Sequence, residues 1–138
     1  PARARAVVNV RVHPGDSIES VIEHMTHAIG DSRVTVRRLP GIMSEPSAVS
    51  PMESSTFTTL QRTIGQQFPD AIVAPGLVLG ATDSRHYQSL SEQVYRFLPL
   101  QVNASDIARI HGVNERLAVD NYADVIAFYM RVIRNFNE

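Results

Sequence analysis

A stretch rich in proline and serine, residues 41–52, interrupts the apolar patterning of this chain. It contains Pro46 and Pro51 together with several serines. Such clusters are typical of linkers, because proline has no amide hydrogen to give to a helix or a sheet. We therefore expect a boundary here, with residues 1–40 and residues 53–138 in separate structural units. A total of 138 residues fits one ordinary globular domain or two small pieces of larger ones.

The composition is that of a folded chain, with 43% hydrophobic and 20% charged residues. The 13 basic and 14 acidic residues leave a formal net charge of -1, so we expect no nucleic-acid partner. No window reaches the roughly 18 apolar residues that a membrane-spanning helix needs, so we expect no membrane span. Residues 1–11 lack the apolar core of a secretory signal, and the localisation stays open between cytoplasmic and exported.

Two residue types are absent. Without cysteine, disulfides and thiolate metal sites are excluded, and a metal would have to be held by His, Asp or Glu. All 13 basic residues are arginines, which excludes lysine Schiff-base chemistry. Any anionic group would therefore be recognised by guanidinium groups.

The first unit has the pattern of a strand, a helix and a second strand. Residues 5–12 alternate between apolar and polar side chains, with the two-residue period of a half-buried strand. Asp16 and Glu19 then form a capping-box pattern ahead of a helical apolar stripe, which Gly30 closes. Val34 and Val36 with Leu39 predict a second short strand, so we expect a β-α-β arrangement.

The second unit combines helical patterns with apolar runs. Residues 57–68 predict an amphipathic helix, residues 71–79 one or two buried strands, and residues 94–98 a further strand. A long helix is expected at the end of the chain, with an apolar face formed by Tyr122, Val125, Ile126, Tyr129, Val132, Ile133 and Phe136. The predicted fold class is therefore α/β (α+β).

A polar segment that contains Gly80, Thr82 and Arg85 directly follows the apolar run. Loops at strand ends are common ligand sites. Glycine lets a ligand approach the backbone, threonine offers a hydroxyl group, and arginine can hold a carboxylate through two parallel hydrogen bonds. These three residues are the candidate substrate-binding residues. The alternative is a strand-to-helix turn in which Thr82 or Asp83 caps a short helix and Arg85 is solvated.

A second segment places His111 beside a glycine and four residues before the carboxylate of Glu115. A neutral imidazole is a common zinc ligand. The neighbouring Glu115 and Asn114 could support such a ligand from outside the coordination sphere. The alternative is a histidine that is hydrogen-bonded within the structure and has no functional role.

His24 and His27, preceded by His13, form a third candidate, because helical spacing could bring the pair to one metal. Both lie opposite the predicted apolar stripe of their helix. We therefore favour a solvated helix face over a metal site.

Five motifs in the chain resemble those of the carboxypeptidase S and aminoacylase family of dinuclear zinc exopeptidases, especially its Gly-Xaa carboxypeptidase branch. They are AVVNVRVHPGD (6–16), EPS (45–47), GATDSRHY (80–87), YRFxP (95–99) and IHGVNER (110–116). They span almost the whole chain at natural separations. Five motifs in the family's order are far more specific than any one of them.

The resemblance implies a fold. Enzymes of this family have a catalytic α/β domain interrupted by a smaller ferredoxin-like lid domain, which often forms the dimer contact. By that resemblance, residues 1–40 correspond to the last β-α-β portion of the lid and dimerisation domain. Residues 41–52 are the linker, and residues 53–138 correspond to the C-terminal part of the catalytic domain. A homo-oligomer is therefore expected.

The resemblance also implies roles for single residues. In the family, the histidine matched by His111 is the last metal ligand, and the residues matched by Thr82 and Arg85 lie where the arginine meets the substrate's free carboxylate. The parent protein would hold two zinc ions. The remaining metal ligands and the general base belong upstream of residue 1. We therefore expect no catalytic residue in this chain, no stoichiometric zinc bound by it alone, and no activity of it alone.

The sequence thus predicts part of a zinc-dependent metallohydrolase, a carboxypeptidase or aminoacylase. Its substrates would be peptides or N-acyl amino acids with a free C-terminal carboxylate, cleaved at an amide bond. The alternative is a non-catalytic oligomerisation or ligand-binding module whose β-α-β piece extends a partner's sheet.

Overall fold

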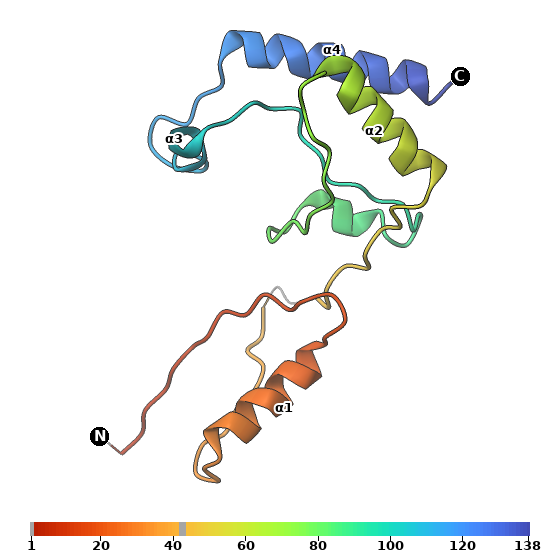
Figure 1. The fold of residues 1–138 in the computed structure, drawn as a ribbon. Coiled ribbons are helices and arrows are strands. Elements are labelled where there is room, and N and C mark those ends of the chain that lie inside the picture. Colours follow the sequence, from red (N-terminus) through yellow and green to blue (C-terminus); the bar gives the residue numbers. More distant parts are fainter. Residues whose placement is uncertain (1, 42–43) are drawn as a thin grey trace. The chain divides into compact units, whose positions relative to one another are not determined.

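The computed structural model describes residues 2–41 and 44–138 (Figure 1). Pro1 lies outside the described residues, and so do residues 42–43 of the predicted linker. The elements follow in the order α1 (Ile18–Ile29), α2 (Ser55–Gln67), the 3-10 helix η1 (Asp83–His86), α3 (Ala104–Ile107) and α4 (Val119–Asn135). None of the helices in the described ranges is both long enough and apolar enough to cross a membrane.

The chain divides into two compact units. The first contains the residues up to Val49 together with Leu79–Ser89, and the second contains Ser50–Val78 together with Leu90–Glu138. Within the first unit, the Arg11 guanidinium donates a hydrogen bond to the carbonyl oxygen of Leu79. The segment that carries η1 therefore groups with the N-terminal part of the chain.

The prediction of an α/β fold with a ferredoxin-like lid is wrong, because the described residues contain helices but no β-strand and no sheet. The segments expected to be strands, residues 5–12, 34–39, 71–79 and 94–98, have no strand paired with them. A strand is stable only when its N–H and C=O groups bond to a neighbouring strand. Alternation shows which side chains share a face, but it does not supply that neighbour. Ile72, expected to be buried, is 94% exposed.

The N-cap of helix α1 lies one residue later than predicted. Ser17, rather than Asp16, is the N-cap, and it exchanges reciprocal 3.0 Å hydrogen bonds with Ser20 between backbone N–H groups and hydroxyl oxygens. The Glu45 carboxylate accepts a further bond of 3.0 Å from the N–H of Ile18. A negative charge at this position also interacts favourably with the helix dipole. Gly30 ends the helix in the left-handed conformation (φ 61°), as its sequence position predicts.

The second unit is built on the packing of α2 against α4 (Figure 1). Phe128 of α4 is 1% exposed, and Thr63 and Ile64 of α2 are 0% and 5% exposed. The Phe128 ring lies 5.3 Å from the ring of Phe97 and 6.5 Å from that of Phe68, measured between centroids. These aromatic contacts form the core that holds the two helices and residues 94–101 together.

Polar side chains close the same interface. The Asn135 amide nitrogen donates to Thr63 Oγ1 at 2.7 Å and to Gln66 Oε1 at 2.9 Å. The buried hydroxyl of Thr63 donates in turn to the carbonyl oxygen of Thr59 at 2.7 Å. Buried polar groups are therefore paired here, as a stable interface requires.

Helix α4 buries a different part of its surface from the one predicted. Val125 and Val132 are half-buried as expected, but the fully buried residue is Phe128, which the predicted face did not include. The other members of the predicted face are exposed, namely Tyr122, Ile126, Tyr129, Ile133 and Phe136. We call this set the exposed α4 stripe. One neighbouring helix covers only part of a wide apolar sector, and the neighbour decides which part.

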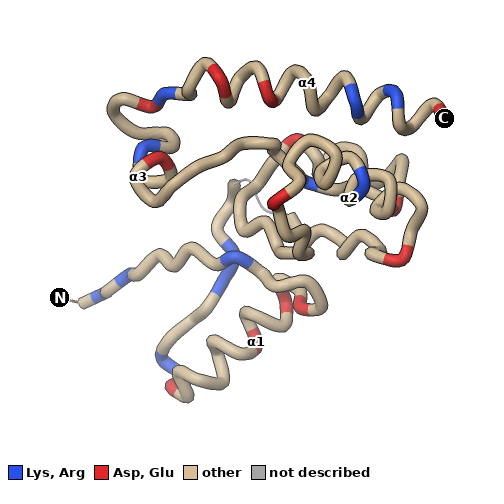
Figure 2. Tube along the Cα trace, turned by 45° about the horizontal axis from the view of Figure 1, so that its top comes forward, with Lys and Arg blue, Asp and Glu red and all other residues tan. Residues whose placement is uncertain are grey.

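The charges on α4 follow the helix dipole. Acidic residues lie toward its N-terminal end and arginines toward its C-terminal end (Figure 2), with Asp120 in the first turn and Arg134 in the last. Both placements oppose the partial charges at the helix ends and favour the helix independently of its packing.

We expect Phe128→Ala to lower the free energy of unfolding by about 3–4 kcal/mol, because it leaves a cavity at the centre of the α2–α4 interface. The measurement is urea denaturation followed by the helical circular dichroism signal. Ile133→Ala, on the same helix but 64% exposed, is the matched control and should lower stability by less than about 1 kcal/mol. A larger effect at Ile133 than at Phe128 would show that α4 packs through the exposed α4 stripe.

Candidate functional site

The segment with Gly80, Thr82 and Arg85 forms an exposed turn around η1. Thr82 occupies the N-cap position of η1 without a side-chain capping bond, and its hydroxyl is hydrogen-bonded to that of Ser84. Arg85 Nε donates to His86 Nε2 at 3.2 Å. A Cβ built on Gly80 would meet no atom within 4 Å, so the space beside this backbone is open.

Arg85 makes no ion pair with any of the described residues, and it is exposed. Asp83, in the same short helix, is not its partner. With Nε engaged by the His86 ring, the two Nη groups can reach an external anion. A carboxylate is the group whose two oxygens match a guanidinium in geometry and charge.

His111 lies in the loop of residues 102–118, which includes α3 and which we call the His111 loop. The two ends of this loop are tied together by Gln101 and Asn121. The Gln101 N–H donates to Asn121 Oδ1 at 3.2 Å, and Asn121 Nδ2 donates to the Gln101 carbonyl at 2.8 Å. The His111 loop therefore leaves the aromatic core and returns to it at points that are hydrogen-bonded to each other.

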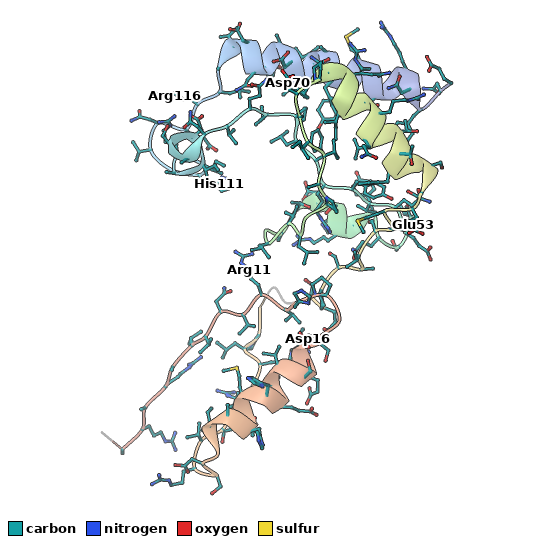
Figure 3. All side chains as sticks on the ribbon, in the orientation of Figure 1. Arg11, Asp16, Glu53, Asp70, His111 and Arg116 are labelled. Carbon is teal, nitrogen blue, oxygen red and sulfur yellow. The ribbon has the colours of Figure 1, made fainter. Side chains whose placement is uncertain are left out.

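The backbone of the His111 loop is left-handed at two residues other than glycine. His111 has φ 61° and Asn114 has φ 62°. Asparagine and histidine are over-represented in this conformation, which nevertheless costs a residue other than glycine about 1–2 kcal/mol. Strained residues of this kind cluster at functional sites, where the surrounding structure holds them in place. His111 is exposed, and both it and Arg116 project from the loop in Figure 3.

Asn114 and Glu115 are exposed, and within the described structure neither forms a hydrogen bond with His111. The left-handed φ of Asn114 shapes the turn that follows His111. Support of a metal ligand by these two side chains stays a prediction.

The His111 loop contains an electrostatic feature that the sequence analysis missed. Asp106 Oδ2 accepts a 3.0 Å bond from the N–H of Asn103, and Asp106 Oδ1 accepts a bond from Arg109 Nη2. The bond from Asn103 is the main cause that lowers the pKa of Asp106, and Arg109 and the charge of Arg116 act in the same direction against the effect of burial. The pKa of Asp106 is lower in the folded protein than in the unfolded chain. At pH values above the ordinary pKa of an aspartate, the bonds therefore stabilise the folded protein. That contribution is lost only as the pH falls through the lowered value.

A sequence signal for this feature exists. Asn103 and Asp106 stand at the spacing of a capping box, and Arg109 follows Asp106 by three residues. The side chain of Asn103 also accepts bonds from the N–H groups of Ser105 and Asp106, at 2.9 and 3.2 Å. The one-turn helix α3 was not predicted because it has too few residues for a periodic apolar pattern.

Among residues 2–41 and 44–138, no group of three or more His, Asp or Glu side chains is arranged to hold a metal ion. His24 and His27 lie on the exposed face of α1. The ring of His13 is engaged with the carbonyl oxygen of Pro14 at 2.7 Å. A metal at His111 would therefore need ligands from outside these residues.

The structure gathers the predicted site residues into two groups. Gly80, Thr82 and Arg85 share one turn in the first unit. His111, Asn114 and Glu115 share the His111 loop in the second unit. The first group presents an exposed guanidinium and the second an exposed imidazole.

Comparison with known proteins gives a consistent result over almost the whole chain. The model of peptidase family M20/M25/M40 matches residues 3–135. A Dictyostelium discoideum protein named "Probable carboxypeptidase S-like 2" is 43% identical over 135 residues, which are 98% of this chain and 26% of that protein. No solved structure matches the chain significantly.

Vertebrate relatives cover the same range. The N-fatty-acyl-amino acid synthase/hydrolase PM20D1.1 of Danio rerio is 36% identical over 137 residues, 98% of this chain and 26% of that protein. The human synthase/hydrolase PM20D1 is 36% identical over 138 residues, 98% of this chain and 27% of that protein. The chain thus spans about a quarter of the length of the curated relatives it matches.

We expect His111→Gly to be more stable than His111→Ala by about 1 kcal/mol. Both variants lack the imidazole, but only glycine adopts a positive φ without strain, and this gain exceeds the entropy that glycine loses on folding. Chemical denaturation of the two variants side by side gives the difference. Equal stabilities, or a more stable alanine variant, would mean that residue 111 is not held in the left-handed conformation.

Proposed function

This chain belongs to peptidase family M20/M25/M40, and on that basis we propose that it is part of a zinc-dependent hydrolase of amide bonds. Its substrates are peptides or N-acyl amino acids with a free C-terminal carboxylate. The observation that carries the proposal is the family match over residues 3–135, almost the entire chain. Substrates of this kind fit the names of the relatives, a probable carboxypeptidase S-like protein and N-fatty-acyl-amino acid synthase/hydrolases.

We assign the two parts of the chain to different domains. Residues 1–40 belong to a lid and dimerisation domain, and residues 53–138 belong to part of the catalytic domain. The separation of the described chain into two compact units supports two bodies. Leu79–Ser89 depart from this division, because they group with the first unit although they lie within residues 53–138.

The residues present are compatible with zinc. The imidazole of His111 is exposed, and no described residue forms a hydrogen bond with its ring, so a ring nitrogen is free to bind a metal. Cysteine is absent, which leaves nitrogen and oxygen donors, the ligands of hydrolytic zinc sites. When bound, zinc supplies an activated water and polarises the scissile carbonyl. His111 is the ligand that this chain contributes.

Arg85 and Thr82 orient the substrate. The two Nη groups of Arg85 hold both oxygens of the terminal carboxylate, and the hydroxyl of Thr82 donates a third hydrogen bond. Gly80 keeps the backbone open for the approach of the substrate. This grip selects substrates with a free carboxylate and fixes the position of the scissile amide.

In the full-length protein, Arg85→Lys should lower kcat/KM for substrates with a free carboxylate. The expected loss of transition-state stabilisation is about 2 kcal/mol, because an ammonium group cannot make the paired bonds. Amidated substrates should be affected much less. Arg131→Lys, at an exposed position on α4, is the control and should leave both activities unchanged. Equal losses on both substrate types would give Arg85 a structural role instead.

His111→Ala should reduce the zinc content of the full-length protein and nearly abolish turnover, because it removes a metal ligand. Elemental analysis after dialysis measures the first effect, and initial rates measure the second. His24→Ala, on the exposed face of α1, should change neither. Wild-type zinc content without His111 would remove this residue from the metal site. The present chain by itself should retain no stoichiometric zinc.

One observation favours the alternative function, a non-catalytic oligomerisation or ligand-binding module. The exposed α4 stripe and valines near the N-terminus, such as Val7 (66% exposed) and Val8 (60%), leave large apolar side chains in water. A gene that encodes an H-x-D motif and a Glu-Glu pair upstream of residue 1 supports the enzyme. Translation that starts near Pro1 supports the module.

We expect this chain to self-associate at tens of micromolar, because the same apolar side chains are covered when copies pack together. Light scattering over a dilution series should show a mass that rises with concentration. Ile133→Glu, on the exposed α4 stripe, should shift the series toward the monomer. A compact monomer with a cooperative melt would contradict the expectation.

A further inference from the structure

The His111 loop is held by a small network centred on Arg109. The Arg109 N–H donates to the Asp106 carbonyl at 3.0 Å, and the Arg109 carbonyl accepts the N–H of Gly112 at 2.9 Å. Residues 110 and 111 are therefore enclosed in a turn whose acceptor is the Arg109 carbonyl. The left-handed φ of His111 occurs inside this turn.

The side chain of Arg109 fastens the same turn to α3. Its Nη2 donates to Asp106 Oδ1, and the two side chains are only 25% and 31% exposed. The other carboxylate oxygen, Asp106 Oδ2, accepts the N–H of Asn103, which caps α3. One carboxylate thus connects the start of the loop with the residue that begins the turn at His111.

The turn leaves little space for a side chain at residue 112. A Cβ on Gly112 would lie 3.3 Å from the Arg109 carbonyl oxygen and 3.7 Å from its carbon. The first distance is tighter than an ordinary van der Waals contact, so a residue larger than glycine at position 112 would crowd the Arg109 carbonyl. Displacement of Arg109 would therefore move the backbone on both sides of His111.

Arg109 is not optimised for stability alone. Its Nε is buried and has no hydrogen-bond partner among the described residues. A buried unpaired donor is destabilising, and native structures keep few of them. The guanidinium of Arg109 is thus kept in the turn although its buried Nε is unpaired. This is a feature of a residue that maintains the conformation of the neighbouring strained histidine.

We infer that Arg109, through its bond to Asp106, is a positioning residue that fixes the backbone of His111 and so the direction of its imidazole. The inference rests on the proposed function, in which that imidazole binds zinc. Arg109 itself touches neither metal nor substrate. Its effect on zinc is indirect and requires only one hydrogen-bond donor.

The test compares variants of the full-length protein by zinc affinity, measured by competition with a chelator, and by the separate values of kcat and KM. Arg109→Gln should weaken zinc binding by about tenfold or more, the usual effect of losing a partner that orients a ligand. The value of kcat should fall while KM stays near that of the wild type. Arg109→Lys should restore most of the affinity, because only Nη2 contacts Asp106.

Arg33→Gln is the matched control, because Arg33 forms the other described ion pair, with Asp31, in the first unit. It should leave zinc affinity unchanged. If Arg109→Gln fails to fold, Asp106→Asn answers the same question. It removes the charge partner of Arg109 while an amide oxygen can still accept from Asn103.

The outcomes separate the inference from the function on which it rests. If His111→Ala loses zinc but Arg109→Gln and Asp106→Asn bind it as the wild type does, the inference is wrong and the proposed function stands. If His111→Ala keeps its zinc, the proposed role of His111 is wrong. In that case the amide-to-Hα coupling of residue 111, measured by NMR in the present chain, still tests whether Arg109 fixes its φ. An unchanged coupling in Arg109→Gln would overturn that part as well.

Discussion

The burial of Phe128 is the interaction on which the second unit depends. Its ring contacts Phe97 and Phe68 and meets the ring of Tyr129 edge-on, at a centroid distance of 5.7 Å. Burial of one phenylalanine side chain contributes roughly 2–3 kcal/mol. That contribution joins three parts of the chain, α2, α4 and residues 94–101. Because these residues lead into the His111 loop and α4 leads out of it, the same aromatic cluster anchors both ends of the candidate metal-binding segment.

Hydrogen bonds from serine complete this arrangement. Ser50 donates to the Val94 carbonyl at 2.9 Å and accepts the Val94 N–H at 3.0 Å. Ser54 caps α2 and lies 2.7 Å from the hydroxyl of Tyr95, whose ring is 5.5 Å from that of Phe57. The backbone of Val94 thus gains the partners that a neighbouring strand would otherwise supply. This pairing explains how an extended apolar segment is held in place without a sheet.

The two groups of candidate residues differ in how firmly the chain holds them. The turn at Arg85 is exposed, and Arg85 bonds through Nε to the neighbouring His86, which leaves its two Nη groups available to a substrate. The His111 loop is closed by Asn121, capped by Asn103 and braced by the pair of Asp106 and Arg109. A metal ligand benefits from such bracing, because its direction must be set before the metal binds. The exposed α4 stripe is an apolar surface that no described residue covers. The chain spans about a quarter of the length of its relatives.

The sequence by itself determined the local features. The apolar period predicted α1, α2 and α4, because helix hydrogen bonds join residues only four apart. The order of five motifs predicted the family, which the match over residues 3–135 confirms. The tertiary structure decided whatever depends on residues distant in sequence. Strand pairing was predicted where no partner strand exists, and Phe128 rather than the exposed α4 stripe faces the core because α2 covers that side. The cap that Glu45 provides for α1 and the left-handed backbone of His111 likewise had no signal in the apolar pattern, since each is set by neighbouring groups and not by residue type.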